Sequence, residues 1–265
     1  IAECLVGSEM CIRDSSLALA FLTKVYALKK NLNPRYFIVD HKLRKESTYE
    51  AYKVKKILKS LKINSQVLTW KGKKPVSNIQ SLVRSKRYEL LFLKCKKLKI
   101  SNLVLGHHID DVIENFFLRM ARGSGLKGLV SLGTNTQIEN INLIRPLIEF
   151  DKRDLIFLSK FIFNFYVDDP TNDDIKFNRI KIRNFIKRFE DFGLDKKKFQ
   201  LTIENLKKSD QSIKFYVEKN KRVNSVFNYK KNQLILKENF FDNSHEVIFR
   251  SCLLYTSDAA DEVRS

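Results

Sequence analysis

The chain has 265 residues and 43% apolar content, which is enough for one α/β domain and part of a second. Its 50 Lys and Arg against 30 Asp and Glu give a formal charge of +20, which favours an anionic partner, RNA or DNA before a membrane surface. No apolar run approaches ~18 residues, so no membrane span is expected, and few cysteines predict no disulfide framework and a reducing cytoplasm.

Apolar periodicity divides residues 16–192 into alternating helices and strands. The expected helices cover residues 17–29, 46–61, 79–98, 110–120, 151–163 and 177–189. The expected strands cover residues 36–39, 65–70, 103–105 and 141–144, with a loop at 72–77. This alternation predicts an α/β fold with a doubly wound, mostly parallel sheet of Rossmann-like type.

The composition changes near residue 193, where we expect a domain boundary. A long lysine-rich helix is predicted at 194–217, followed by β-like segments at 226–236 and 246–249. Residues 193–251 are therefore expected to form a partial, mostly helical second domain. The lysines of 195–222 either attract phosphate non-specifically or form a solvated helix surface, and the second reading is favoured.

The most informative segment is residues 106–129, which read GHHIDDVIENFFLRMARGSGLKGL. Asp110 and Glu114 share one face of a helix that begins directly after an apolar strand. Ligands bind at this place in open α/β sheets. Acids that can hold Mg²⁺, beside bases that can hold phosphate, indicate nucleotide chemistry. The plainer alternative is a charged helix N-terminus, where acids are favoured in any case.

Four ordered segments resemble the tRNA(Ile)-lysidine synthetase family of the PP-loop ATP pyrophosphatase superfamily. They are residues 39–47 (like VDHGLRxxS, with Lys42 for Gly), 79–88 (like IQxxARxxRY), 106–129 (like HHxDDxxET and RGSGLxGL, with Asn115 for Thr) and 169–183 (like DPSNxDxxFxRxxIR). The resemblance covers residues 16–190 well and continues more weakly to about 250, and it implies that residues 193–251 are part of a domain that binds substrate or tRNA. Four motifs in the family's order are a specific signal, whereas one alone is weak.

The resemblance implies ATP-dependent ligation of free L-lysine to the 2-carbon of the wobble cytidine of tRNA(Ile), through an adenylated cytidine. ATP and Mg²⁺ are the expected cofactors, and a homodimer without membrane attachment is the expected state. The candidate catalytic residues are His107, Asp110, Asp111 and Glu114, of which Asp111 and Glu114 are the candidate Mg²⁺ ligands. The candidate ATP-binding residues are Ser15, Ser16, Asp40, His108 and Arg122. The candidate tRNA or phosphate contacts are Arg84, Arg87, Arg179 and Arg183.

Structural alternatives stand beside these roles. Asp40 could instead cap the next helix, one of the two histidines could be a buried structural residue, and the arginine pairs could form surface salt bridges or solvated faces. Zinc held by His41, His107 and His108 is disfavoured, because soft ligands are absent and the aspartate pair suits a harder ion.

Both ends of the chain look foreign. Residues 9–14 can be encoded by GAGATGTGTATAAGAGAC and residues 252–257 by TGTCTCTTATACACATCT. The second string is the reverse complement of the core of the first, shifted in frame. The string resembles a transposon end used in sequencing-library adapters. We therefore expect residues 1–15 and 252–265 to be adapter-derived and leave them out of fold prediction. The family's glycine-rich SGGxDS phosphate loop is missing around residues 10–16, so the chain as given is expected to be impaired.

Two other functions stay open at this point. A tRNA thiolase of the same superfamily usually needs catalytic cysteines, and only Cys95 lies outside the suspect ends. A non-catalytic tRNA-binding fragment would follow from the loss of the phosphate loop.

Overall fold

The computed structural model describes residues 4–8, 14–42, 46–72, 79–164, 178–228, 231 and 233–262. The chain forms two compact units. The first contains Ile1–Ser124 and Ser131–Lys196, and the second contains Gly125–Val130 and Lys197–Ser265. One short segment, Gly125–Val130, is thus grouped with the second unit. The domain boundary expected at 193 stays a prediction.

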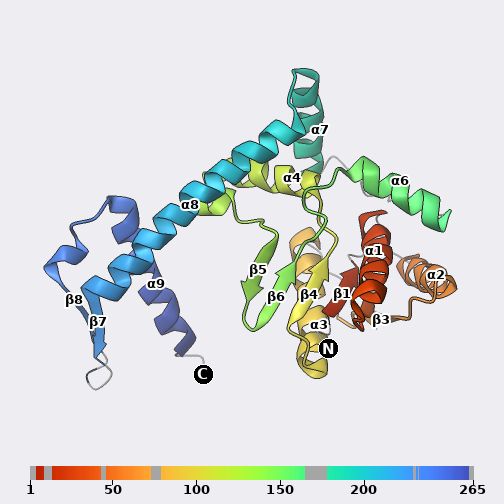
Figure 1. The fold of residues 1–265 in the computed structure, drawn as a ribbon, viewed down its shortest axis with the longest axis horizontal. Helices are drawn as coiled ribbons and strands as arrows, with labels where there is room; N and C mark the ends of the chain where they lie inside the picture. The colour runs from red at the N-terminus through yellow and green to blue at the C-terminus, as the bar shows by residue number, and fades with distance from the viewer. Residues whose placement is uncertain are drawn as a thin grey trace. The chain divides into compact units, whose positions relative to one another are not determined.

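The first unit is built on a six-stranded sheet in the order β3-β2-β1-β4-β6-β5 (Figure 1). Its strands are β1 (Cys4–Ser8), β2 (Arg35–Asp40), β3 (Ser65–Thr69), β4 (Asn102–Leu105), β5 (Asn135–Ile138) and β6 (Ile141–Ile144). All neighbouring pairs are parallel except β5 with β6, which is antiparallel. The predicted mostly parallel sheet is thus confirmed.

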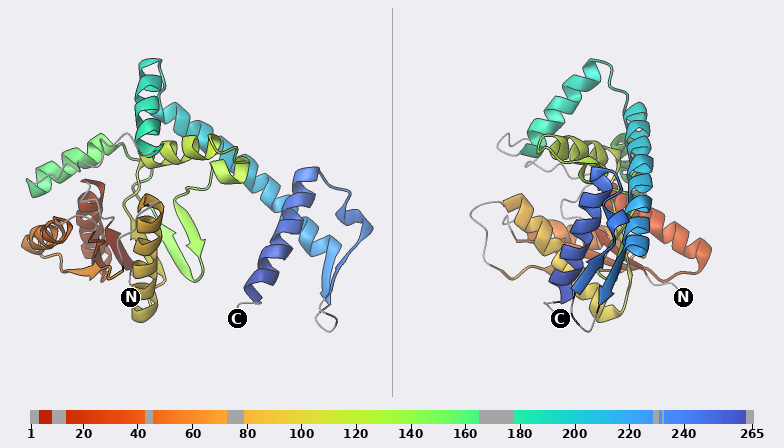
Figure 2. Two further views of the ribbon diagram at one scale, coloured as in Figure 1. Left: turned by 180° about the vertical axis from the view of Figure 1, so that it is seen from behind. Right: turned by 90° about the vertical axis from the view of Figure 1, so that its left-hand side faces the viewer.

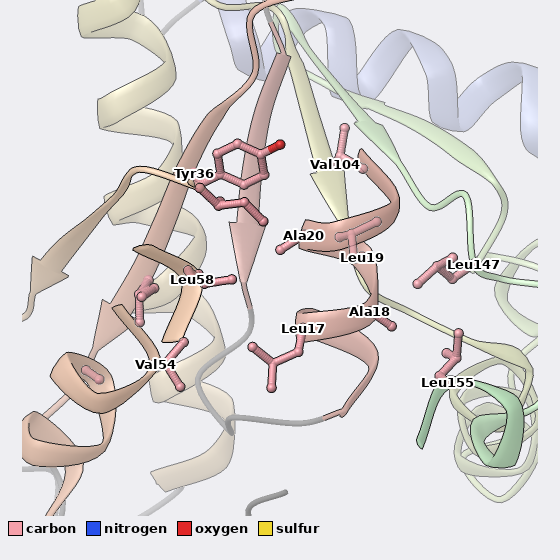
Figure 3. Close-up of a cluster of buried hydrophobic side chains, with 13 residues drawn as sticks. Leu17, Ala18, Leu19, Ala20, Tyr36, Val54, Leu58, Val104, Leu147 and Leu155 are labelled. Carbon is pink, nitrogen blue, oxygen red and sulfur yellow. The ribbon is translucent and has the colours of Figure 1, made fainter. Parts of the chain in front are cut away.

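Helices lie on both faces of this sheet, as Figure 2 shows from two further directions. On one face lie α1 (Asp14–Lys30), α2 (Ser47–Ser60) and α6 (Lys152–Phe163), and on the other lies α3 (Ile79–Leu98). Helices α4 (Ile109–Met120) and α7 (Asn178–Asp191) pack against each other. One core cluster joins the sheet to α1, α2 and α6, and it contains Leu17, Leu58 and Leu155 (Figure 3). A second cluster packs Leu91 and Cys95 of α3 on the other face.

Strand β2 shows why the sheet needs helices on both sides. Tyr36 and Ile38 belong to the first cluster, whereas Phe37 and Val39 belong to the second. Side chains alternate between faces along a strand, so a continuous apolar run can be buried only in a sheet that is covered twice. This is the sequence property that made the doubly wound architecture predictable.

Strand β5 was not predicted. It forms an antiparallel hairpin with β6, and its side chains are mostly exposed. Buried Arg145 donates through Nη1 to the carbonyl oxygen of Gly133 and to Thr136 Oγ1, both at 2.9 Å. Because a polar run such as residues 135–138 lacks apolar alternation, its strand conformation depends on β6 and on Arg145 rather than on its own pattern.

The second unit consists of helices around a small hairpin. Its elements are α5 (Leu126–Leu129), the rest of α8 (Lys196–Asn224), β7 (Ser225–Asn228), β8 (Gln233–Leu236), the 3₁₀ helix η2 (Glu238–Phe240) and α9 (His245–Glu262). Buried Asn220 organises its interior by donating to the Phe240 carbonyl oxygen at 3.2 Å and accepting from Asn224 at 2.8 Å.

The strand expected at 246–249 is wrong, because these residues lie inside α9. The Val-Ile-Phe run suggested a strand, but Val247 and Ser251 are both buried at a spacing of four residues. Ser251 Oγ also donates to the carbonyl oxygen of Val247 at 2.7 Å. Tertiary burial of one helical face has therefore overridden local β propensity.

Both stretches that were left out of fold prediction contain regular structure. Cys4–Ser8 forms the strand β1 between β2 and β4, and α9 continues to Glu262. Regular structure does not show which DNA encoded these two stretches, so their adapter origin stays a prediction.

Candidate active site

The strand order reverses between β1 and β4, so the carboxyl ends of these two strands flank a topological switch point. Open α/β sheets bind ligands in the crevice at such a point. Gly106 follows β4 there, and a Cβ atom added to it would lie only 3.2 Å from the Ser15 carbonyl oxygen. The missing side chain at Gly106 therefore lets the end of β4 approach the start of α1.

The start of α1 carries two of the predicted ATP-binding residues. Ser15 and Ser16 are 6% and 5% exposed, respectively. Within the described part of the chain, the buried Ser16 hydroxyl has no hydrogen-bond partner. A buried hydroxyl at the first turn of a 17-residue helix is suited to an anionic ligand, because the helix N-terminus also presents backbone N–H groups.

The segment after β4 leads directly into α4. His107 and His108 are buried, and His108 is the N-cap residue of the helix. The backbone N–H of His108 donates to Asp111 Oδ2 at 3.0 Å. His108 Nδ1 lies 3.8 Å from Asp110 Oδ2. The structure thus brings together His107, His108, Asp110 and Asp111, and it gives Asp111 a helix-capping contact as well.

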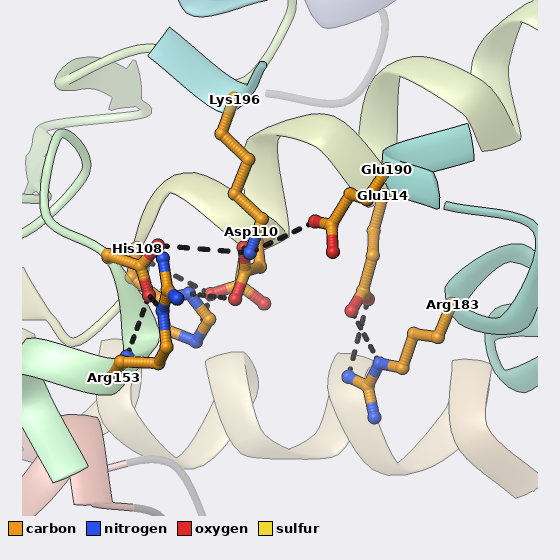
Figure 4. A network of polar contacts seen from close by, with 9 residues as sticks. His108, Asp110, Glu114, Arg153, Arg183, Glu190 and Lys196 are labelled. Carbon is orange, nitrogen blue, oxygen red and sulfur yellow. Dashed lines mark hydrogen bonds and ion pairs between the residues drawn. The ribbon is translucent and has the colours of Figure 1, made fainter. Parts of the chain in front are cut away.

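Glu114 and Arg183 form an ion pair within the first unit, although their motifs predicted a Mg²⁺ ligand and a phosphate contact. The Arg183 guanidinium donates through Nε to Glu114 Oε1 and through Nη2 to Oε2, the latter at 3.3 Å (Figure 4). Glu114 is buried in α4, whereas Arg183 projects from α7. Two motif residues that are 69 positions apart in the sequence therefore meet in a bidentate ion pair.

Asp40 is fully buried at the end of β2. Its Oδ1 accepts from the backbone N–H of Lys42 at 2.9 Å and from Ser47 Oγ at 3.0 Å. Its Oδ2 accepts from Thr48 Oγ1 at 2.7 Å. These contacts hold the start of α2 against the end of β2. They agree with the alternative in which Asp40 stabilises the start of the next helix. The ATP-binding role of Asp40 stays a prediction.

His41 is also buried and lies beside the motif arginine Arg87 of α3. Burial and then the positive charge of Arg87 lower the pKa of His41 from 6.5 to about 4, against the opposing effect of Asp40. The folded protein therefore keeps this imidazole neutral at neutral pH.

This shift predicts acid sensitivity. Between pH 6.5 and about 4 the unfolded chain protonates His41 but the folded chain does not. The free energy of unfolding should therefore fall as the pH drops through this interval. Urea denaturation across the interval measures the effect. His41→Asn, which cannot titrate, should show a flatter pH dependence, and an equal dependence in both proteins would exclude His41 as the cause.

The remaining predicted arginines differ in their surroundings. The Arg84 guanidinium lies 5.7 Å from the centre of the Tyr88 ring, a cation–π arrangement on α3. Arg122 is exposed in the turn after α4, where Gly123 adopts a φ of +69° that favours glycine. Arg179 lies on α7, but its side chain is outside the described residues. The phosphate roles of these arginines stay predictions.

A lysine that no motif suggested lies next to the predicted carboxylates. Lys196 Nζ is 2.7 Å from Asp110 Oδ1, 3.3 Å from Glu190 Oε1 and 3.8 Å from Asp151 Oδ2. Figure 4 shows the ammonium group of Lys196 between Asp110 and Glu190. Sequence reasoning missed this group because its members come from four separate elements and share no spacing rule.

The carboxylates proposed for Mg²⁺ do not form a ready metal site. One oxygen of Asp111 accepts the His108 N–H, and both oxygens of Glu114 accept from Arg183. Among the described residues, no group of three or more His, Cys, Asp or Glu is arranged to hold a metal ion. As arranged here, these side chains do not fit a Mg²⁺ held by the protein alone, and no chemical step is assigned to them through it.

Part of the predicted site lies outside the described residues. This applies to Asp169, Pro170, Thr171, Asn172 and Phe177 of the last motif segment and to residues 9–13, where the glycine-rich loop was expected. Among the described residues, no helix is long and apolar enough to cross a membrane.

Comparison with known families gives one domain match. A sequence model of the PP-loop domain matches residues 13–189. The tRNA(Ile)-lysidine synthase of Orientia tsutsugamushi (strain Boryong) is 38% identical over 175 residues, which cover 65% of this chain and 39% of that protein. The tRNA(Ile)-lysidine synthase of Bradyrhizobium diazoefficiens is 34% identical over 182 residues, 68% of this chain and 50% of that protein. The chain thus spans half or less of the length of these curated relatives.

Among solved structures, the U34-tRNA thiolase NcsA from Methanococcus maripaludis superposes with a TM-score of 0.65. The superposition covers 78% of this chain and 70% of that one, at 16% sequence identity. At this identity the likeness concerns the fold, which agrees with the predicted PP-loop architecture.

Proposed function

Because the chain belongs to the PP-loop domain family, we propose that it is the ATP-using part of a tRNA(Ile)-lysidine synthase. The observation that carries the proposal is the meeting of two segments at the switch point. The start of α1, with Ser15 and Ser16, lies against Gly106, and Gly106 leads into the His107–Asp111 segment. Sequence identity of 34% and 38% to named lysidine synthases over most of this chain supports the same reaction.

The proposed reaction has two steps. The 2-oxygen of the wobble cytosine of tRNA(Ile) attacks the α-phosphorus of ATP, an O–P bond forms and pyrophosphate leaves. The amine of free L-lysine then forms a C–N bond to the cytosine 2-carbon and loses a proton, while the C–O bond breaks and AMP departs with the oxygen. Negative charge builds on the phosphates in the first step and must be balanced by fixed donors.

The residues at the switch point are suited to these needs. The N-terminus of α1 would bind the phosphates through backbone N–H groups and the Ser16 hydroxyl. His107 and His108 would donate to phosphate or to the activated base, and the carboxylates of Asp110 and Asp111 would attract the lysine ammonium or accept its proton. Binding of tRNA(Ile), assembly as a homodimer and action in the cytoplasm are further parts of this proposal.

The thiolase alternative is not favoured by the site. Of the cysteines whose side chains the structure describes, Cys95 and Cys252 are free. Cys95 is buried in α3, and burial raises the pKa of its thiol from 9.0 to about 11. A thiol that stays protonated at neutral pH is a poor nucleophile.

Incorporation of labelled lysine into isoleucine tRNA transcripts, with ATP and Mg²⁺, tests the proposal. The chain as given is compared with a variant in which residues 1–15 are replaced by a strand and an SGGxDS loop. We expect activity only in the loop-restored variant, because the loop's glycines let backbone N–H groups approach the phosphates. Activity in both would show that the glycine loop is dispensable, and inactivity of both would contradict the assignment of the reaction to this part of the enzyme.

A further inference from the structure

Lys196 is surrounded by carboxylates from three different elements of the first unit. Asp110 belongs to the first turn of α4, Asp151 is the N-cap residue of α6, and Glu190 is near the end of α7. Lys196 itself is the first residue of α8. One ammonium group therefore links the beginnings or ends of four helices at a single point.

The cluster is partly shielded from solvent. The side chains of Lys196, Asp110 and Asp151 are 24%, 21% and 21% exposed, and that of Glu190 is 35% exposed. By contrast, Lys214 and Glu218 on the same helix α8 form an exposed pair at 3.8 Å, with 71% and 63% exposure. Exposed pairs of that kind contribute little, whereas a shielded cluster interacts in a lower effective dielectric.

Neighbouring charges shift the pKa values of Lys196 and Asp151 in this cluster. Burial alone would lower the pKa of Lys196, but the hydrogen bond to Asp110 and the charges of Asp110, Asp151 and Glu190 outweigh it and raise the pKa. Burial would likewise raise the pKa of Asp151, but hydrogen bonds from Arg153 and the charges of Lys196 and Arg153 lower it. The ion pairs thus favour the charged forms of both groups despite their partial burial.

We propose that Lys196 is a positioning residue of the active site, which holds the carboxylate of Asp110 in place from the start of α8. The proposal rests on the proposed function, because it makes Asp110 part of the reacting site. Without the ammonium group, Asp110, Asp151 and Glu190 would repel one another. Arg153 does not replace it, since its guanidinium is bound to Asp151 at 3.2 Å. The Asp110 carboxylate would then move away from the His108 imidazole, whose Nδ1 lies 3.8 Å from Asp110 Oδ2.

The first arm of the test does not depend on catalysis. Hydrogen exchange is measured by mass spectrometry for the chain as given and for its Lys196→Gln and Lys214→Gln variants. Both variants lose one positive charge from α8, so they are matched for overall charge. We expect faster exchange at the amides of residues 109–112 only in Lys196→Gln, because the first turn of α4 loses its tether. Equal exchange in the two variants would overturn the proposal.

The second arm uses the loop-restored chain and measures lysine incorporation. Lys196→Gln should lower kcat on the order of 10-fold or more through misplacement of Asp110, with KM for ATP nearly unchanged. Lys196→Arg should recover part of kcat because it keeps the charge, and Lys214→Gln should behave as the parent. A lower melting temperature with unchanged kcat would show a structural role only and overturn the proposal.

The two arms separate failure of the inference from failure of the proposed function. If the loop-restored parent forms no lysidine, the proposed function fails, and the contact between Lys196 and Asp110 is judged by hydrogen exchange. Asp110→Asn, Lys196→Gln and the double variant then form a cycle on the exchange rates of residues 109–112. Non-additive effects would support positioning of Asp110 by Lys196, and additive effects would overturn it.

Discussion

Replacing Arg183 with alanine should lower the free energy of unfolding by about 2 kcal/mol. Helix α7 would keep its packing on α4 through the ring contacts of Phe117 with Phe185 and Phe189. The change removes both donors from Glu114, whose side chain is only 6% exposed, and leaves a carboxylate without its cation in the core. Breaking a fully buried pair costs ~3–5 kcal/mol. The effect expected here is smaller, because the Arg183 side chain retains 26% exposure and water can partly replace it. Urea denaturation of the chain as given measures the change.

Arg188→Ala is the matched control, because Arg188 lies on the same helix with an exposed side chain. It should change the free energy of unfolding by no more than a few tenths of a kcal/mol. Adding Glu114→Gln to Arg183→Ala should recover part of the loss, because the uncompensated buried charge disappears. Equal destabilisation by Arg183→Ala and Arg188→Ala would refute the ion pair as the tie between α4 and α7.

In the loop-restored chain, Asp111→Ala should reduce lysidine formation ~10²-fold or more, the range expected when a proton-transferring or charge-stabilising group is lost. The stability change should be modest, about 1 kcal/mol, because the substitution also removes the acceptor for the His108 N–H. Lysine incorporation and thermal unfolding, measured on the same preparation, separate the two effects.

Asp111→Asn makes the distinction sharper. Its side-chain oxygen can still accept the His108 N–H, so stability should return close to that of the parent protein. The negative charge is absent, so activity should stay low. Near-normal activity in Asp111→Ala, or full recovery in Asp111→Asn, would remove Asp111 from the group of catalytic residues.

The fold could be predicted largely because burial leaves a strong pattern. Continuous apolar runs such as residues 36–39 indicate strands covered on both faces, and the helix expected at 79–98 coincides with α3. Strand β5 and helix α9 could not be predicted in the same way. The polar strand exists because β6 and Arg145 hold it. The helix exists because it buries Val247 and Ser251, and Ser251 accepts a hydrogen bond from Asn220 of α8 at 3.4 Å.

The residues of the site could be predicted from the sequence, but the contacts between them could not. Motif resemblance selected residues that the fold brings together, including His108, Asp110 and Asp111 at one helix start. It could not reveal pairing between motifs, since only the folded chain shows that Arg183 reaches Glu114. It could not find Lys196 at all, because that lysine resembles its exposed neighbours in sequence and differs from them only by what surrounds it.

The edge strand β5 has a consequence for how the protein behaves in concentrated solution. A parallel sheet that ended at β6 would expose a row of unpaired amides beside Ile141 and Leu143, which are buried in this fold. Such an edge can recruit a strand from another molecule. Strand β5 instead forms the edge of the sheet, and it carries Asn, Thr and Gln side chains. Arg145 holds it in place by donating a hydrogen bond to Thr136. Replacing Arg145 should therefore cause self-association of otherwise folded molecules before any ligand-binding site is lost.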